Sequence, residues 1–154
     1  MIPYRRCVGI FLIKDGRIFV GQRIDVKKAW QLPQGGIEDG ETCLEAARRE
    51  LFEETNISST EFLGLSCSYR YKFPMRIRMI LAKKWGRLMY IGQEITFCAF
   101  RFTGDESEIN LQKDSQEFEN WKWMSSDELL KSIVYFKKPS YKMALAKFKE
   151  LNFF

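Results

Sequence analysis

Apolar runs and turn signals alternate in the first part of the chain. Cys7 to Ile13 is almost entirely apolar, and an extended pattern resumes at residues 17–23, after Asp15 and Gly16. An Asp-Gly pair between two such runs is a strong hairpin signal, because both residues tolerate positive φ. The pattern predicts a β-hairpin that opens the fold, followed by a charged loop at residues 24–29.

A glycine-rich stretch follows at residues 30–36. Trp30 and Gln31 have the character of a short strand end, whereas Pro33, Gly35 and Gly36 disfavour regular structure. We therefore expect an irregular loop here, with its backbone free to face a ligand.

The next segment has the composition of a helix. Thr42 followed by Glu45 is a capping-box signal, and the residues up to about Thr55 are rich in Ala, Leu, Glu and Arg. At about 100° per residue, one apolar stripe forms. Its members are Leu44, Ala47 and Leu51.

Three further strands and two further helices are expected in the remainder. The strands are predicted at residues 61–73, 94–102 and 118–124, with a basic loop at 82–93. A capping box from Ser125 to Glu128 predicts one helix, and an amphipathic stretch after Pro139 predicts another. The pattern favours a mixed sheet with helices packed on it.

Composition narrows the chemistry. With 154 residues, 45% apolar, the chain builds one core, so a single domain spanning residues 1–154 is expected. A net charge of +5 favours an anionic partner such as a polyphosphate or RNA. The sequence contains no histidine, which excludes Ser-His-Asp and Cys-His nucleophiles and leaves carboxylate and metal chemistry.

The sequence also indicates the cellular environment and the oligomeric state. The four cysteines are far apart, without a C-x-x-C pair, which fits a reducing cytoplasm. The apolar run near the N-terminus is too short to span a bilayer, so no membrane partner is expected. We further expect a monomer.

Acidic residues concentrate on the helix that follows the glycine loop. Glu50, Glu53 and Glu54 lie on an arc beside the apolar stripe, and like charges one turn apart repel by a few tenths of a kcal/mol per pair. A solvated helix face, with Arg48 and Arg49 as salt-bridge partners, is the simple explanation of an isolated run. Beside a glycine loop, a hard divalent cation shared with substrate phosphates is the alternative.

Gly35, Glu41 and residues 49–57 together resemble the Nudix box, G-x5-E-x7-R-E-U-x-E-E-x-G-U, where U is aliphatic. One position departs: Asn56 stands where the family has glycine. Asparagine is the next-best residue for the left-handed conformation that closes a helix, so we expect the geometry to survive.

The resemblance implies an α/β/α sandwich with a central mixed β-sheet, and hydrolysis of a nucleoside diphosphate linked to another moiety. Glu50, Glu53 and Glu54, with Gly35, would hold Mg²⁺ or Mn²⁺, which activates a water for attack on phosphorus. Arg49 would orient a carboxylate, and Glu41 would brace the loop formed around Gly36. Which glutamate is the general base stays open.

Longer segments resemble the bacterial RNA pyrophosphohydrolase and dinucleoside polyphosphate hydrolase branch of the family. They are WQLPQGGIEDGE, IGQE, EFENWKWM and IVYFKK. By this resemblance, Glu117 adds a metal-binding carboxylate. Substrate contacts are expected from Arg5, Arg23, Gln34, Phe136 and Lys137, the last two as a base-stacking and cation pair.

The function expected from this branch is a metal-dependent RNA 5′-pyrophosphohydrolase that leaves a 5′-monophosphate. A diadenosine polyphosphate hydrolase is the alternative, and a non-catalytic module that binds nucleotides or RNA is a third. The complete set of Glu50, Glu53 and Glu54 argues against the third. No DNA partner is expected. The basic loop with Lys83, Lys84 and Arg87 either guides an RNA strand or is merely solvated.

Overall fold

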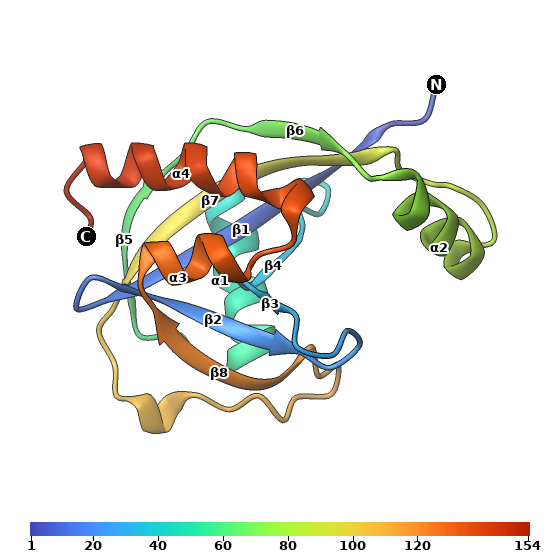
Figure 1. Ribbon diagram of the computed structural model, residues 1–154. Coiled ribbons are helices and arrows are strands. Elements are labelled where there is room, and N and C mark those ends of the chain that lie inside the picture. Colours follow the sequence, from blue (N-terminus) through green and yellow to red (C-terminus); the bar gives the residue numbers. More distant parts are fainter.

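A mixed β-sheet of eight strands forms the centre of the computed structural model, which describes all of residues 1–154 (Figure 1). The strands are β1 (Tyr4–Lys14), β2 (Arg17–Arg23), β3 (Trp30–Gln31), β4 (Gln34–Gly36), β5 (Thr60–Leu65), β6 (Tyr69–Lys72), β7 (Gly92–Phe102) and β8 (Phe118–Met124). β1 and β7 pair in parallel at the centre, and every other pairing is antiparallel.

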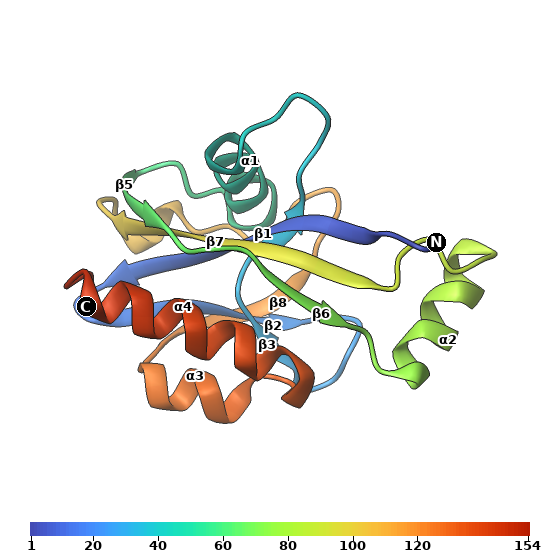
Figure 2. The same cartoon turned by 90° about the horizontal axis from the view of Figure 1, so that it is seen from above.

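Helices cover both faces of this sheet. They are α1 (Cys43–Thr55), α2 (Met75–Trp85), α3 (Ser126–Ser132) and α4 (Lys138–Glu150), with short 3₁₀ turns at Glu106–Glu108 and Tyr135–Lys137. Figure 2 shows α1 on one face, α3 and α4 on the other, and α2 projecting beyond the sheet. The expected α/β/α sandwich is confirmed. None of the four helices has the length and apolar character that crossing a membrane requires.

The apolar run of β1 serves two cores at once. Cys7 and Phe11 belong to a cluster under α3 and α4, whereas Val8, Ile10 and Leu12 belong to a cluster under α1. Side chains alternate between the faces of a strand, so a strand covered on both faces reads as a continuous apolar run.

The predicted hairpin is confirmed. β1 and β2 are joined by Asp15 (φ 51°) and Gly16 (φ 73°), and Lys14 pairs with Arg17. Both turn residues thus adopt the left-handed conformation that a tight hairpin requires.

The expectation of an irregular loop at Pro33–Gly36 was wrong. Gln34–Gly36 forms β4, antiparallel to β1, with Gly36 opposite Cys7 and Gly35 opposite Val8. The hairpin partner β2 pairs with β1 only near the turn, which leaves the N-terminal half of that β1 edge open. Hydrogen bonding to this open edge outweighs the low strand propensity of glycine.

The basic loop expected at residues 82–93 is confined to residues 86–91, so its predicted bounds were wrong at both ends. Residues 75–85 form α2, and β7 begins at Gly92. Pro74 precedes the helix, and Gly86, at φ 77°, ends it in the left-handed conformation. These are ordinary boundary signals, and Ile77 and Leu81, one turn apart, pack against the core under α4.

The strand expected at residues 61–73 is in fact two strands. β5 and β6 both pair with β7, at different ends of it. The chain leaves the sheet between them, where the Ser66 hydroxyl accepts a hydrogen bond from the Phe97 amide at 2.9 Å. The long β7 thus accommodates two short neighbours along one edge.

α1 begins and ends at the expected residues. The Thr42 hydroxyl accepts from the Glu45 amide, but the Glu45 carboxylate contacts that hydroxyl rather than the Thr42 backbone, so the predicted capping box is only half formed. In α3 the box from Ser125 to Glu128 is complete. At the other end of α1, Asn56 adopts φ 67°, which confirms that asparagine keeps the terminating geometry.

The conformation and contacts of Asn56 predict the effect of replacing it. Its side-chain Nδ2 donates to the Glu108 backbone carbonyl at 3.0 Å, and its side-chain Oδ1 accepts from Lys113 Nζ at 3.2 Å. Asn56→Ala removes both bonds and adds left-handed strain, so we expect a loss of about 1–3 kcal/mol in the free energy of unfolding. Asn56→Gly should lose less. Urea denaturation measures both.

Asn152, at φ 60° after α4, gives a matched control. Its change to alanine adds left-handed strain at another helix end without these two hydrogen bonds. Equal losses for Asn56→Ala and Asn152→Ala would contradict a stabilising role of the Asn56 side chain.

Candidate active site

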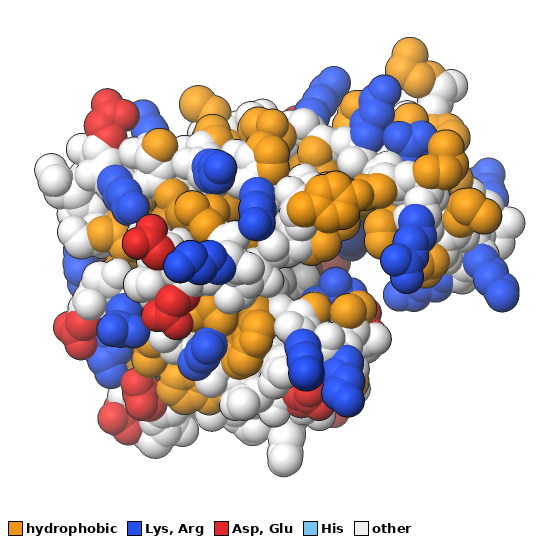
Figure 3. Space-filling model, viewed as in Figure 1, with side chains coloured by type: hydrophobic (Ala, Val, Ile, Leu, Met, Phe, Trp, Pro, Cys, Tyr) orange, Lys and Arg blue, Asp and Glu red, His pale blue; other side chains and the backbone are white.

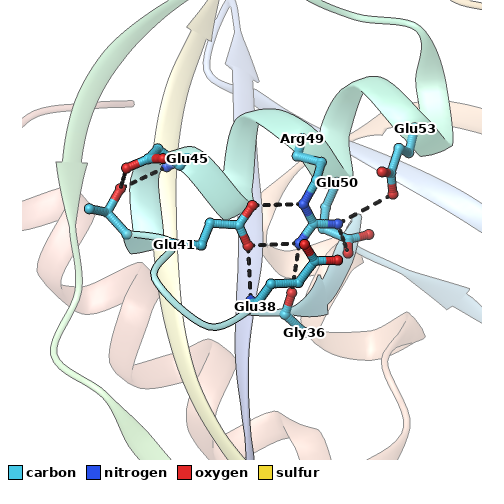
Figure 4. A network of polar contacts seen from close by, with 8 residues as sticks. Gly36, Glu38, Glu41, Glu45, Arg49, Glu50 and Glu53 are labelled. Atoms are coloured by element: carbon cyan, nitrogen blue, oxygen red, sulfur yellow. Dashed lines mark hydrogen bonds and ion pairs between the residues drawn. The ribbon is translucent and has the colours of Figure 1, made fainter.

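One guanidinium group ties together the glycine strand, the following loop and α1 (Figure 4). Arg49 donates to both oxygens of Glu41, from Nε at 2.7 Å and from Nη2 at 2.9 Å. Nη2 also donates to the Gly36 carbonyl at 2.9 Å. Nη1 donates to Glu50 at 2.8 Å and to Glu53 at 3.4 Å.

Glu41 is held from two sides. Besides Arg49, its Oε1 accepts from the Glu38 amide at 3.0 Å, which fixes the loop between β4 and α1. Hydrogen bonds from the Arg49 guanidinium, followed by that from the Glu38 amide, lower the pKa of Glu41 to about 2. The Glu41 carboxylate therefore stays charged and holds Arg49 in place.

Gly35 is required by the close approach of Glu50. A side chain at Gly35 would overlap the Glu50 carboxyl group, and one at Gly36 would press on the Arg5 guanidinium. β4 thus presents bare backbone to both charged groups. The close approach explains the glycines better than turn chemistry does, because neither has positive φ.

Four glutamates line one cavity of about 350 Å³. Glu50, Glu53 and Glu54 come from α1, and Glu117 comes from the loop before β8. The rest of the lining is Phe52, Lys113, Asp114 and Ser115. The sequence analysis did not single out these four residues. Phe52 lies on α1 among the glutamates, whereas residues 113–115 lie in a stretch without periodicity, and only their proximity to Glu117 in the chain could have indicated them.

The helical position of Glu54 suggested a place at the edge of the buried face of α1, but its side chain is buried. Its Oε2 has no hydrogen-bond partner. Burial, reinforced by the charges of Glu50 and Glu117, raises the pKa of Glu54 well above its usual value. Burial also raises the pKa of Glu50, although Arg49 opposes this. A buried, unpartnered carboxylate oxygen among like charges fits a bound cation.

The carboxylate groups that line the cavity do not converge on a common metal position. No three acidic or thiol groups lie close enough together to hold a metal ion as the side chains stand. Glu50 and Glu53 instead share the Arg49 guanidinium, and the Glu53 side chain is 56% exposed.

The five residues expected to contact substrate lie outside the lining of this cavity. Arg5 lies against Gly36, and Gln34 lies in β4. Arg23 forms two hydrogen bonds to Asp25, at 2.9 and 2.6 Å. The sequence did not reveal this pairing.

Phe136 and Lys137 lie in the 3₁₀ turn before α4. The Phe136 ring is half-buried, with its centroid 6.0 Å from that of Tyr71. Lys137 is buried and donates to Gln31 Oε1 at 3.3 Å. Burial, followed by the nearby charge of Arg23, lowers the pKa of Lys137 to about 8.

Comparison with known proteins identifies the family. The family model described as the NUDIX domain matches residues 3–144, which include the glycine strand, the Arg49 network and all four cavity glutamates. The chain belongs to the Nudix hydrolase family. Nudix hydrolases generally use divalent metal ions, in agreement with the environment of Glu54.

Two Nudix relatives are similar along almost the whole chain. A Cereibacter sphaeroides protein named RNA pyrophosphohydrolase is 41% identical over 153 residues, which cover 96% of this chain and 92% of that protein. An Arabidopsis thaliana protein named "Nudix hydrolase 27, chloroplastic" is 40% identical over 152 residues. There the match covers 96% of this chain but 66% of the plant protein.

Solved structures agree on the Nudix fold. A Caenorhabditis elegans Ap4A hydrolase, in a binary complex, superimposes with a TM-score of 0.65 at 19% identity, covering 94% of this chain and 98% of that one. At this identity the likeness establishes the fold alone.

The environment of Glu54 predicts how stability depends on pH without metal. Because its pKa is raised in the folded protein, the carboxyl group stabilises the fold most below its unfolded pKa, and this contribution is lost as pH rises. In chelator at neutral pH, Glu54→Gln should therefore raise the free energy of unfolding, because the neutral amide removes the buried negative charge. The gain should shrink toward acid pH. Urea denaturation across this pH range measures it.

Glu45→Gln, an exposed change on the same helix, is the matched control and should have little effect. Mg²⁺ should then stabilise the wild type more than Glu54→Gln, since only a ligand that binds the folded state raises its stability. A Glu54→Gln variant less stable than wild type at neutral pH in chelator would contradict a destabilising effect of the buried Glu54 charge.

Proposed function

We propose that this protein is an RNA 5′-pyrophosphohydrolase that removes pyrophosphate, or successive phosphates, from triphosphorylated 5′ ends and leaves a monophosphate. The observation that carries the proposal is the 41% identity to a protein named RNA pyrophosphohydrolase, along 92% of that protein's length. The carboxylate cavity supports the same reaction class, because phosphate transfer to water needs charge neutralisation more than a protein nucleophile.

Glu50, Glu53, Glu54 and Glu117, with the Gly35 backbone, are the groups we propose for holding Mg²⁺ or Mn²⁺. All are oxygen donors, which both ions accept. The unpartnered Oε2 of buried Glu54 supports this assignment most directly. When bound, such an ion neutralises phosphate charge and lowers the pKa of the attacking water.

Arg49 is proposed as a positioning residue. Its two bonds to Glu41 and one to Gly36 anchor the guanidinium independently of the cavity glutamates. Nη1 then faces Glu50 and Glu53 and limits their rotation. Holding reactive groups in fixed geometry is worth several kcal/mol in catalysis.

The substrate is proposed to contact Arg5, Arg23, Gln34, Phe136 and Lys137. Arg23 would exchange its pairing with exposed Asp25 for a phosphate, which costs little because exposed ion pairs contribute about 0–1 kcal/mol. The Phe136 ring would stack on a base, worth about 1–3 kcal/mol.

The working environment is proposed to be a reducing one, such as the cytoplasm. All four cysteines carry free thiols, and Cys7 and Cys98 are buried. The monomeric state stays a prediction, which light scattering measures.

Product analysis with Mg²⁺ tests the function. We expect a short triphosphorylated RNA to be converted to its monophosphate faster than diadenosine tetraphosphate is cleaved at equal concentration. Faster cleavage of the dinucleotide would favour a dinucleoside polyphosphate hydrolase instead. If neither substrate is hydrolysed, the proposal is wrong.

Removing the Glu53 carboxylate should abolish most of this turnover. We expect Glu53→Gln to lower kcat by about 10²- to 10⁴-fold, the range usual for loss of a group that holds or moves charge in the reaction. The fold should survive, since the Glu53 side chain is 56% exposed. Glu45→Gln on the same helix is the control, and near-normal activity of Glu53→Gln would sink the metal-site assignment.

The lowered pKa of Lys137 predicts a pH-dependent affinity. The lysine loses its charge as pH rises through about 8, so KM for the triphosphorylated RNA should rise between pH 7 and 9. Lys137→Met should have a higher KM without this rise. Lys142→Met, an exposed lysine on α4, should behave as wild type.

Stability gives an independent readout of the same group. A folded pKa below the ordinary 10.5 means that the unfolded chain binds the proton more tightly, so the free energy of unfolding should increase above about pH 8. A KM that is flat in wild type while stability rises would show that Lys137 titrates but does not bind phosphate.

A further inference from the structure

A projecting segment has a net charge of +5, the same as the net charge of the whole chain. Residues 75–89, here called the basic segment, comprise α2 and the turn after it (Figure 1). They include Arg76, Arg78, Lys83, Lys84 and Arg87 and no acidic residue. These five charges match the net charge of +5, so the remaining residues have equal numbers of basic and acidic side chains.

None of these five cations forms an ion pair. Four of them are exposed, and Arg78 is half-buried with its Nε donating to the Phe73 carbonyl at 2.7 Å. Unpaired cations clustered on one element attract an anionic partner over several ångströms.

The inner and outer faces of α2 differ. Ile77 and Leu81 pack against the core, and the Trp85 ring lies 5.9 Å from that of Tyr90. The outer face mixes exposed apolar and basic residues: Met75, Arg76, Met79, Ile80, Lys83 and Lys84. Such a surface offers contacts to both phosphates and bases.

The basic segment lies across a hollow from the β2–β3 loop, which follows Arg23. Figure 3 shows a notch between the projecting helix and the β2–β3 loop, with blue side chains on both sides. Lys84 is close enough to Asp25 for its charge to act on that carboxylate, and Asp25 is the partner of Arg23. The loop adds exposed Lys27 and Lys28. Basic side chains therefore line both sides of the notch, and Arg23 lies near one of them through Asp25.

We propose that the basic segment binds the RNA chain downstream of its 5′ end, beyond the first nucleotides. The inference rests on the proposed function and extends its substrate from a phosphorylated end to a strand several nucleotides long. Lys83, Lys84 and Arg87 contact backbone phosphates, and the exposed methionines and Ile80 lie against bases. Recognition of this kind is independent of sequence.

An anionic membrane is the other partner that a basic helix suggests, but the pattern of α2 disfavours it. Helices that lie in a membrane interface segregate apolar and charged residues on opposite faces. At about 100° per residue, Arg76 and Lys83 fall between Met79 and Ile80 on the outer face. Inserting the apolar residues would bury these two charges.

The test compares two triphosphorylated RNAs that share their first three nucleotides, a trinucleotide and a strand about five times as long. The variant combines Lys83→Gln, Lys84→Gln and Arg87→Gln, all at exposed positions. The matched control combines Lys142→Gln, Lys147→Gln and Lys149→Gln on α4, which removes the same charge elsewhere. Fluorescence anisotropy with a 5′-monophosphorylated form of the long strand measures binding without turnover.

We expect the α2 variant to lose about tenfold in affinity and in kcat/KM for the long RNA, and less than twofold for the trinucleotide. The slope of log affinity against log salt should shrink by about 0.7 for each RNA phosphate that the variant no longer neutralises. The α4 control should lose little on either substrate. An equal loss on both substrates, an unchanged long RNA, or an equal effect of the control would overturn the proposal.

Two further outcomes are distinguishable. If wild type hydrolyses neither RNA, the proposed function fails, while the anisotropy measurement still decides whether the segment binds RNA. If wild type sediments with vesicles containing phosphatidylglycerol, the α2 variant does not, and RNA binding is unchanged, the basic segment is a membrane contact and the inference is wrong.

Discussion

The hydrogen-bonded guanidinium of Arg49 is the interaction on which the site depends. It joins β4 through Gly36, the following loop through Glu41, and α1 through Glu50 and Glu53. A lysine has a point charge with three donors and cannot satisfy these acceptors in one plane, whereas the guanidinium fork can. The same cation holds Glu50 and Glu53, which would otherwise repel each other, on the surface of the cavity. The same guanidinium thus fixes the loop around Glu41 and the orientation of Glu50 and Glu53, so the glycine strand and the acidic helix of the Nudix box depend on each other.

The acidic cavity and the cationic surface occupy different parts of the fold, and this separation has a physical cause. α1 can bury Glu54 because its apolar stripe anchors the helix on the sheet, and the sheet supplies bare glycine backbone where the Glu50 carboxyl group approaches most closely. Arg49 is the one arginine that pairs with these glutamates, and its bonds to Glu41 and Gly36 hold it at the edge of the cavity. Arg23 and the basic segment lie outside the cavity lining and pair with none of the cavity glutamates. Burying an unpartnered carboxylate lowers stability, a common property of functional sites.

The sequence predicted the elements whose signals are local. The Asp15-Gly16 hairpin, the helix from Thr42 to Asn56 and the spacing of the Nudix box all depend on residues close together in the chain. β4 was missed because its formation depends on the open edge of β1, which no local pattern reveals. The burial of Glu54 and Lys137 was missed for the same reason, since each depends on elements distant in sequence. The residues lining the cavity next to Glu117 come from an irregular loop, whose sequence has no periodic pattern from which to predict its structure.

α2 is a different case, because its boundary signals were present and the charges concealed them. Pro74 and Gly86 bracket the helix, and Ile77 and Leu81 have helical spacing. Residues 82–93, with Lys83, Lys84 and Arg87 and no acid, nevertheless favoured a basic loop. A helix whose like charges are unpaired folds only if packing compensates, and here the inner apolar residues provide that packing. A flexible loop would collapse its cations toward nearby acids such as Asp25, whereas a helix fixed at the edge of the core holds them apart and directed outward. Rigid presentation of unpaired charge lowers stability, and the docking of α2 on the core limits that loss.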